Sequence, residues 1–182
     1  ISFKDDKLLI QALTHKSFDT KNNYEKLEFL GDRVLGFVIS KKLLELYPNE
    51  KVGMIDKKLA NLVNKNKCFE IGKELELDNY ILTGNTEKKK KVNIEKKIIS
   101  DCCESLIGAI YIDKGFEVSS KFILNYWKNY LNLSDITVID SKTRLQEYSL
   151  KKFKALPIYK LISNTGPRPV SYTHLRAHET DS

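Results

Sequence analysis

The stretch Glu25-Lys-Leu-Glu-Phe-Leu-Gly-Asp-Arg-Val-Leu35 places acidic side chains inside an apolar helical pattern. Glu25, Glu28 and Asp32 are spaced i, i+3 and i+7, so all three lie on one face of a helix. The same periodicity predicts a long helix over 23–47, which ends before Pro48 because proline cannot continue a helix. A carboxylate-bearing helix of this kind is the centre of the predicted fold.

A second apolar stretch carries acids at helical spacing. It reads Ile98-Ile-Ser-Asp-Cys-Cys-Glu-Ser-Leu-Ile-Gly-Ala-Ile-Tyr-Ile112, with Asp101 and Glu104 at i and i+3. Beyond Glu104 the segment is apolar on every side, so we expect the helix over 96–113 to be buried on several faces.

Acids in such apolar helices favour a metal site, although a pair of surface acids would be unremarkable in a chain with 30% charged residues. Carboxylates near a core repel one another and need protons, basic partners or cations. Hard divalent cations such as Mg²⁺ prefer oxygen ligands. A di-iron bundle is the competing metal site, but it commonly uses Glu-x-x-His pairs, and His15 stands outside both helices. A carboxylate Mg²⁺ site in a basic protein indicates phosphoryl chemistry.

Composition is that of a soluble domain, and its basic charge suits either a polyanionic partner or simply a lysine-rich surface. The 182 residues are 41% hydrophobic and carry a net charge of +7, which favours nucleic acid or an anionic surface. No apolar run reaches the roughly 18–20 residues of a membrane span. The three cysteines form no paired framework, and the chain opens without a charged-then-apolar leader. We therefore expect a cytoplasmic protein without membrane contact.

The chain changes character after its helical part. Helical patterns without strands run to about residue 131 and predict an all-α domain. A basic amphipathic helix over 141–153 and a strand over 158–163 then predict the start of an α+β domain, because one helix and one strand cannot bury a core. The end of the chain shares no pattern with the rest and reads like translated sequencing adapter; the alternative is a divergent native tail. The predicted organisation is a catalytic domain (1–133), a linker (134–140), a truncated second domain (141–169) and a non-native tail (170–182).

The residues resemble the ribonuclease III family. The octapeptide from Glu25 to Asp32 is similar to the family's signature motif, and the similarity extends in register over about 1–168. The other matching segments are 12–17 (Ala-Leu-Thr-His-Lys-Ser), 100–113 in the second acidic helix, and 142–147 with 159–166, which are similar to the opening of a double-stranded RNA-binding domain.

The resemblance implies roles for individual residues. It implies four metal-binding carboxylates, of which two are catalytic, together with an accessory acid of the cleft, an aromatic residue at a dimer contact, and two residues that meet the RNA minor groove. These are Glu28, Asp32, Asp101 and Glu104 for the metal, with Asp32 and Glu104 catalytic; Glu25 for the accessory acid; Phe29 for the dimer contact; and Gln146 and Glu147 for RNA.

The implied activity is Mg²⁺-dependent hydrolysis of double-stranded RNA by a homodimer. Mn²⁺ can replace Mg²⁺, and no small-molecule cofactor or covalent intermediate is expected. Products would carry 5′-phosphates and short 3′ overhangs, in ribosomal and messenger RNA processing.

Two alternatives stay open. Non-cleaving relatives that bind structured RNA usually lose one of the acids, and short relatives that trim ribosomal RNA lack the segment 142–147.

Smaller predictions concern residues beside the acids. We expect His15 to be a structural hydrogen-bonding residue, and Gly108 to permit close helix packing. Cys102 and Cys103 should be packing residues, since thiolates suit Mg²⁺ poorly. Arg33 stands where a small residue is common in the family, and its charge could contact phosphate. Val52 replaces a glutamate that the family often carries.

Overall fold

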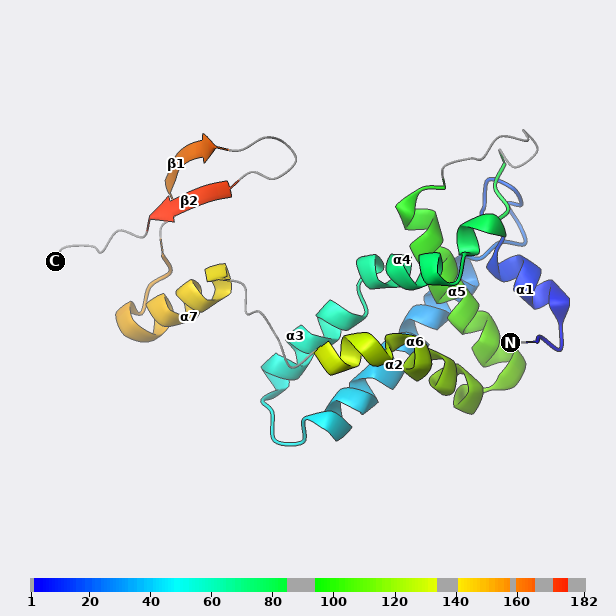
Figure 1. The fold of residues 1–182 in the computed structure, drawn as a ribbon, viewed down its shortest axis with the longest axis horizontal. Helices are drawn as coiled ribbons and strands as arrows, with labels where there is room; N and C mark the ends of the chain where they lie inside the picture. Colours follow the sequence, from blue (N-terminus) through cyan, green and yellow to red (C-terminus); the bar gives the residue numbers. More distant parts are fainter. Residues whose placement is uncertain (1, 85–93, 134–140, 158–159, 166–171, 177–182) are drawn as a thin grey trace. The chain divides into compact units, whose positions relative to one another are not determined.

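The computed structural model describes residues 2–84, 94–133, 141–157, 160–165 and 172–176, and the chain forms two compact units, Ile1–Ile136 and Thr137–Ser182 (Figure 1). The described part of the first unit is helical, which confirms the predicted all-α domain. Its elements are α1 (Asp6–Ala12), α2 (Glu25–Leu46), α3 (Val52–Leu62), α4 (Lys65–Glu74), the short 3₁₀ helix η1 (Leu77–Asn79), α5 (Lys96–Lys114) and α6 (Phe116–Leu133).

Helix α5 forms the centre of the first unit. Every residue from Ile99 to Ile110 is buried, as its apolar sequence predicts, and α5 packs against α1, α2, α4 and α6. The core around it contains Leu35 and Ile39 of α2 together with Ile123 and Trp127 of α6, all fully buried. The two acids of α5 therefore lie inside the most tightly enclosed helix of the described chain.

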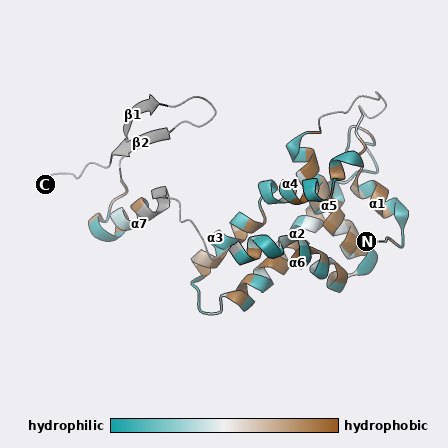
Figure 2. Cartoon of the chain, in the orientation of Figure 1, coloured by the Kyte–Doolittle hydropathy of each residue, from teal (hydrophilic) through white to brown (hydrophobic). Residues whose placement is uncertain are grey.

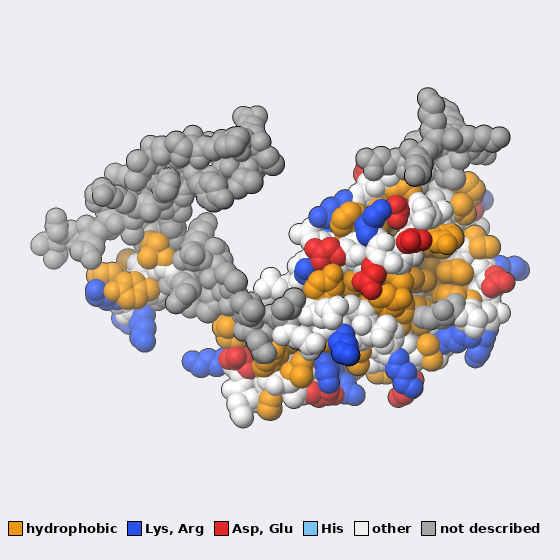
Figure 3. Space-filling view, in the orientation of Figure 1, with side chains coloured by type: hydrophobic (Ala, Val, Ile, Leu, Met, Phe, Trp, Pro, Cys, Tyr) orange, Lys and Arg blue, Asp and Glu red, His pale blue; other side chains and the backbone are white. Residues whose placement is uncertain are grey.

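The other helices carry both hydrophobic and hydrophilic residues. Most mix hydrophobic and hydrophilic residues along their length (Figure 2), and no helix among the described residues is long and apolar enough to cross a membrane. On the face that Figure 3 shows, acidic and basic side chains of the first unit are interspersed. On that face the lysine excess therefore does not gather into a patch of one sign.

The helical spacing over 54–79 is divided between three elements. α3 ends at Leu62, and Asn64 begins α4 as its N-cap, where its side-chain oxygen accepts a hydrogen bond from the Lys67 amide at 3.1 Å. This is the usual role of asparagine before a helix. α4 in turn ends before Glu76, whose backbone is left-handed at φ 54°. The break at Asn64 places Lys65 at the first position of α4.

Two glycines let α2 and α5 touch backbone to backbone. A Cβ at Gly31 would lie 1.8 Å from the carbonyl oxygen of Glu104, and a Cβ at Gly108 would lie 2.2 Å from that of Leu27. Both distances are far below any van der Waals contact, so neither position can hold a larger residue without moving a helix. The predicted role of Gly108 in close packing is confirmed, and Gly31 is its counterpart on α2.

Trp127 joins α6 to the end of α3. Its indole is fully buried, and its Nε1 donates a hydrogen bond to the carbonyl oxygen of Leu62 at 2.8 Å. Leu62 is the last residue of α3, where carbonyl groups have no partner within the helix. The indole thus supplies both packing volume and a partner for a helix end.

Trp127→Phe should lower the free energy of unfolding by about 2–4 kcal/mol, since it leaves a cavity and a buried carbonyl without its donor. Urea unfolding followed by circular dichroism measures this, because Trp127 is the chain's one tryptophan and its fluorescence would be lost. Tyr80→Phe, at a residue 61% exposed, is the control. A loss no greater than that of the control would contradict the proposed role of the indole.

The second unit contains α7 (Ser141–Phe153), β1 (Lys160–Thr165) and β2 (Tyr172–Arg176). The two strands are antiparallel, with Lys160 opposite Arg176 and Thr165 opposite Tyr172, and the register shifts between Leu161 and Asn164. β2 falls within the stretch 170–182, whose non-native origin stays a prediction, as does the assignment of 141–169 to a truncated domain. The predicted linker 134–140 lies outside the described residues.

Candidate metal centre

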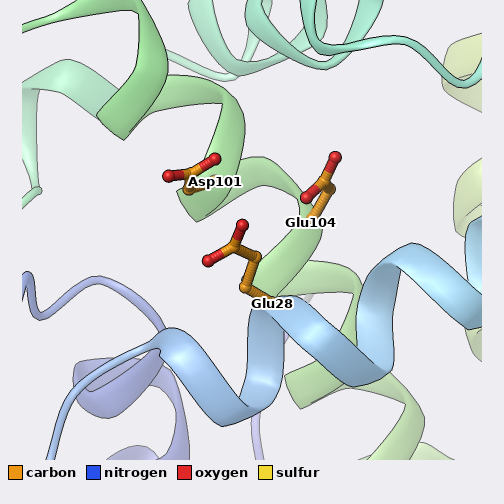
Figure 4. Close-up of side chains that lie close together, drawn as sticks. All are labelled: Glu28, Asp101 and Glu104. Atoms are coloured by element: carbon orange, nitrogen blue, oxygen red, sulfur yellow. The ribbon is translucent and has the colours of Figure 1, made fainter.

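Three carboxylates from two crossing helices converge in the first unit. Glu28 of α2 and Asp101 and Glu104 of α5 each place one oxygen so that the three atoms lie within 4.8 Å of one another (Figure 4). Asp101 and Glu104 are 3% and 2% exposed, whereas Glu28 is half-buried. The structure thus brings together three of the four acids that the sequence suggested as metal ligands.

The glycine contact explains how these acids meet. Gly31 lies one helical turn beyond Glu28, and it touches the backbone of Glu104 itself. Since the helix axes approach this closely, a glutamate one turn before the contact can reach acids on the facing helix. The backbone contact therefore sets the spacing between the carboxylates of α2 and those of α5.

Lys65 lies at the centre of the acid cluster, and nothing in the sequence pattern pointed to it. Its Nζ is 2.6 Å from an oxygen of Asp101, 2.7 Å from one of Glu104 and 3.0 Å from one of Glu28. The three acids are 36, 39 and 37 residues away in sequence. Only the packing of α4 against α5 could have indicated this lysine.

The electrostatics of the cluster favour a cation. Burial raises the pKa of Glu104 above its usual range, even though the hydrogen bond from Lys65 acts in the opposite direction. Burial by itself would lower the pKa of Lys65, but hydrogen bonds to Asp101, Glu104 and Glu28 raise it overall. One ammonium therefore remains firmly charged yet does not fully compensate the buried carboxylates.

A hollow of about 230 Å³ opens beside the cluster. Tyr24 forms part of its wall, and burial above all raises the pKa of this phenol, so that it stays protonated. His15 Nδ1 and Ser17 Oγ share a hydrogen bond of 2.8 Å, and the centroid of the His15 ring lies 5.6 Å from that of the Tyr24 ring. The hollow is lined by His15, Lys16, Tyr24, Glu25, Glu28, Glu95, Lys97, Ile98 and Asp101.

The other predicted acids of α2 lie outside the three-carboxylate group. Asp32 forms an ion pair with Arg33, and the Arg33 guanidinium lies over the Phe29 ring at 5.0 Å from its centroid. Glu25 pairs with Lys16 at 3.0 Å and lines the hollow. The roles predicted for Asp32 as a metal ligand and for Glu25 as an accessory acid stay predictions.

The remaining predicted residues lie on surfaces. Phe29 is 65% exposed, and its place at a dimer contact stays a prediction. Gln146 is half-buried on α7. Glu147 belongs to the same helix, but its side chain is outside the described part of the chain, so contact of either residue with RNA stays a prediction.

The cysteines beside the acids are buried, and the predicted packing role of Cys102 and Cys103 is confirmed. Cys68, Cys102 and Cys103 are fully buried and form no disulfide. Burial raises the pKa of the Cys102 thiol. A hydrogen bond with Cys103, followed by burial, raises the pKa of the Cys68 thiol. The thiols of Cys68 and Cys102 therefore stay protonated, and the metal-ligand atoms that the described residues gather here are carboxylate oxygens.

An all-oxygen donor set suits Mg²⁺ or Mn²⁺ better than zinc or copper, which prefer nitrogen and sulfur. Three clustered carboxylates also account for more negative charge than the single bridging lysine neutralises. A helical domain that holds such a cluster on two crossing helices has the donor set of a carboxylate metal site.

The chain belongs to the ribonuclease III family, since residues 5–131 match the Ribonuclease-III-like family model. Ribonuclease 3 of Pelagibacter ubique is 64% identical over 168 residues, which cover 92% of this chain and 75% of that protein. Ribonuclease 3 of Agrobacterium fabrum is 40% identical over 167 residues, with 91% and 70% covered. The nuclease domain of a ribonuclease III from Campylobacter jejuni matches with a TM-score of 0.67 and 37% identity, covering 72% of this chain and 92% of that one.

Proposed function

We propose that this chain, a ribonuclease III that cleaves double-stranded RNA, holds Mg²⁺ between Glu28, Asp101 and Glu104 and hydrolyses phosphodiester bonds there. The cluster of three carboxylates within 4.8 Å carries this proposal, because a buried all-oxygen site in a nuclease fold suits that ion. Asp32, one turn beyond Glu28 on α2, is proposed as a fourth acid of the site. Mn²⁺ can take the place of Mg²⁺.

The protein's own groups divide the work between them. When bound, the ion would lower the pKa of a coordinated water and neutralise charge that develops on the phosphate. Asp101 and Glu104 are fixed by burial in α5, so their oxygens need little reorganisation before the reaction. Glu104 and Asp32 are the proposed catalytic acids. Products with 5′-phosphates and short 3′ overhangs follow from the family resemblance.

A homodimer is proposed through the outer side of α2. Phe29, Phe37 and Leu44 are 65%, 62% and 59% exposed and lie along one side of this helix. Large apolar side chains exposed in a row commonly mark an interface. The Campylobacter jejuni nuclease domain has a region that is involved in dimer formation.

The second unit is proposed to open an RNA-binding domain. α7 followed by β1 has the order of elements with which the family's double-stranded RNA-binding domain begins. Gln146 and Glu147 on α7 would meet the minor groove, the groove that is accessible in A-form duplexes. Cytoplasmic processing of ribosomal and messenger RNA is the proposed setting, and 170–182 is proposed to be a non-native tail.

Cleavage should depend on a divalent metal. An end-labelled RNA duplex at low salt should be cut with Mg²⁺ or Mn²⁺, stay intact in EDTA, and be cut again when metal is restored. The single strands of the same duplex, tested separately, are the substrate control. Denaturing gels with and without phosphatase treatment identify the 5′ ends of the products.

Two outcomes would overturn the proposal. Cutting that persists in EDTA would exclude the metal. A folded dimer that binds the duplex but does not cut it, with either metal, would favour the non-cleaving alternative.

A further inference from the structure

The ammonium of Lys65 lies where a metal held by the three acids would lie. Its Nζ is 2.6–3.0 Å from one oxygen each of Glu28, Asp101 and Glu104. An Mg²⁺ ion needs its ligand oxygens at about 2.0–2.1 Å and must also stand between them. A divalent ion that binds the same three oxygens would compete for them with the ammonium, because the two cations repel each other at this range.

We propose that Lys65 is a resident counter-cation, which occupies the metal position in the metal-free protein and is displaced when a divalent ion binds. Metal binding would then be an exchange of one cation for another. This inference rests on the proposed metal site, and it assigns to the lysine a role that the family's acidic motifs do not contain.

The surroundings of Lys65 suit such an exchange. Its side chain is 52% exposed, although its tip contacts the buried carboxylates of Asp101 and Glu104, so the lysine can move out into solvent. The backbone at the start of α4 is held independently, because the Asn64 side chain caps the Lys67 amide. Lys65 can therefore leave the cluster without unwinding the helix that carries it.

The counter-cation also explains how the metal-free acids stay buried. Removing one partner of a buried ion pair leaves an uncompensated charge, which is strongly destabilising. Here a single ammonium links α4 to acids of both α2 and α5. The metal-free fold is stabilised by Lys65, and the same contacts must be broken before metal can bind.

Lys65→Gln tests the exchange, with Lys73→Gln as its matched control. Lys73 lies in the same helix, is 47% exposed and pairs with Asp78 at 2.6 Å, away from the cluster. In calorimetric titrations with Mn²⁺ alone, Lys65→Gln should bind the ion about tenfold more tightly than wild type. In EDTA, its melting temperature should fall by about 4 °C. Lys73→Gln should leave the Mn²⁺ affinity unchanged.

Mn²⁺ affinity for Lys65→Gln that equals or falls below that of wild type would overturn the inference, whatever happens to the melting temperature. If the metal-free variant unfolds in EDTA, Mn²⁺ should restore its circular dichroism; a failure to restore it would also overturn the inference. Glu104→Gln separates this result from the proposed function. If that variant binds Mn²⁺ as tightly as wild type does, the three acids do not form the metal site, and the proposed function is wrong. If it binds Mn²⁺ more weakly, the site is supported, and the Lys65→Gln result then tests the exchange alone.

Discussion

Glu104→Gln is expected to lower the rate of duplex cleavage by about three orders of magnitude or more while the protein stays folded. The substitution keeps the size of the side chain and removes one buried carboxylate of the metal cluster. Because burial raises the pKa of Glu104, the ionised acid is costly in the metal-free fold. The variant should therefore melt in EDTA at a temperature equal to or above that of wild type. Residues that serve function often lower stability in this way, so that replacing them stabilises the fold.

Single-turnover cleavage with Mg²⁺ and thermal melting of the same samples measure both halves of this expectation. Asp101→Asn should behave alike, and the double variant should lose no more than either single one, since the acids act as a unit. Glu70→Gln is the control, because Glu70 is 45% exposed and pairs with Lys67 away from the cluster. A Glu104→Gln protein that keeps a tenth of the wild-type rate would rule out this acid as a catalytic ligand.

Gly31→Ala is expected to destabilise the first unit by about 3 kcal/mol or more. The added methyl group would lie 1.8 Å from the Glu104 carbonyl oxygen, and a backbone atom cannot move aside as a side-chain tip can. α2 and α5 must separate, and the core between them loses its packing. Gly108→Ala should act in the same way from the other helix, against the Leu27 carbonyl.

Gly36→Ala in α2 is an unusually close control, because a Cβ at Gly36 would meet nothing within 4 Å. There the alanine should stabilise the helix by about 0.5–1 kcal/mol, through its higher helix propensity. Urea unfolding measures the change in the free energy of unfolding for all three variants. We expect it to fall for Gly31→Ala and Gly108→Ala and to rise for Gly36→Ala, only five residues from Gly31 on the same helix. Equal stability of Gly31→Ala and Gly36→Ala would show that the helices are not in backbone contact.

The sequence predicted those parts of the site that share a helix. Spacing alone placed Asp101 and Glu104 on one face of α5, and their apolar neighbours correctly indicated burial. Gly108 was also predicted as a position of close helix packing, and its contact with Leu27 confirms this. The spacing within α2 could not decide which of its acids reaches those of α5. Glu25, Glu28 and Asp32 share one face but extend over about 10 Å of the helix axis, so the answer depends on where α5 crosses. The helix crossing at Gly31 places Glu28 in the group of three carboxylates, and the role of Asp32 stays a prediction.

Lys65 could not be predicted because no local pattern links it to the acids. It stands among many lysines in a chain that has 31 basic residues, and a charge beside a helix start is commonly a solvated one. Its contacts depend on where α4 begins and on how α4 packs against α5. Asn64, as a helix-capping residue, could have indicated that α4 begins at Lys65, but not that α4 packs against the acids.

The cluster formed by Lys65 and the three acids also shapes the electric field that an approaching RNA meets. Three carboxylates and one ammonium leave two negative charges in a chain whose net charge is +7. Far from the protein, the positive total attracts a polyanion. Within about 8 Å, the Debye length at physiological salt, the local negative charge repels the phosphates of the strand. When a divalent ion takes the place of the ammonium, the charge of the cluster falls from two negative to one. We therefore expect duplex RNA to be attracted at long range in either state, and to approach the acids more readily once the ion is bound.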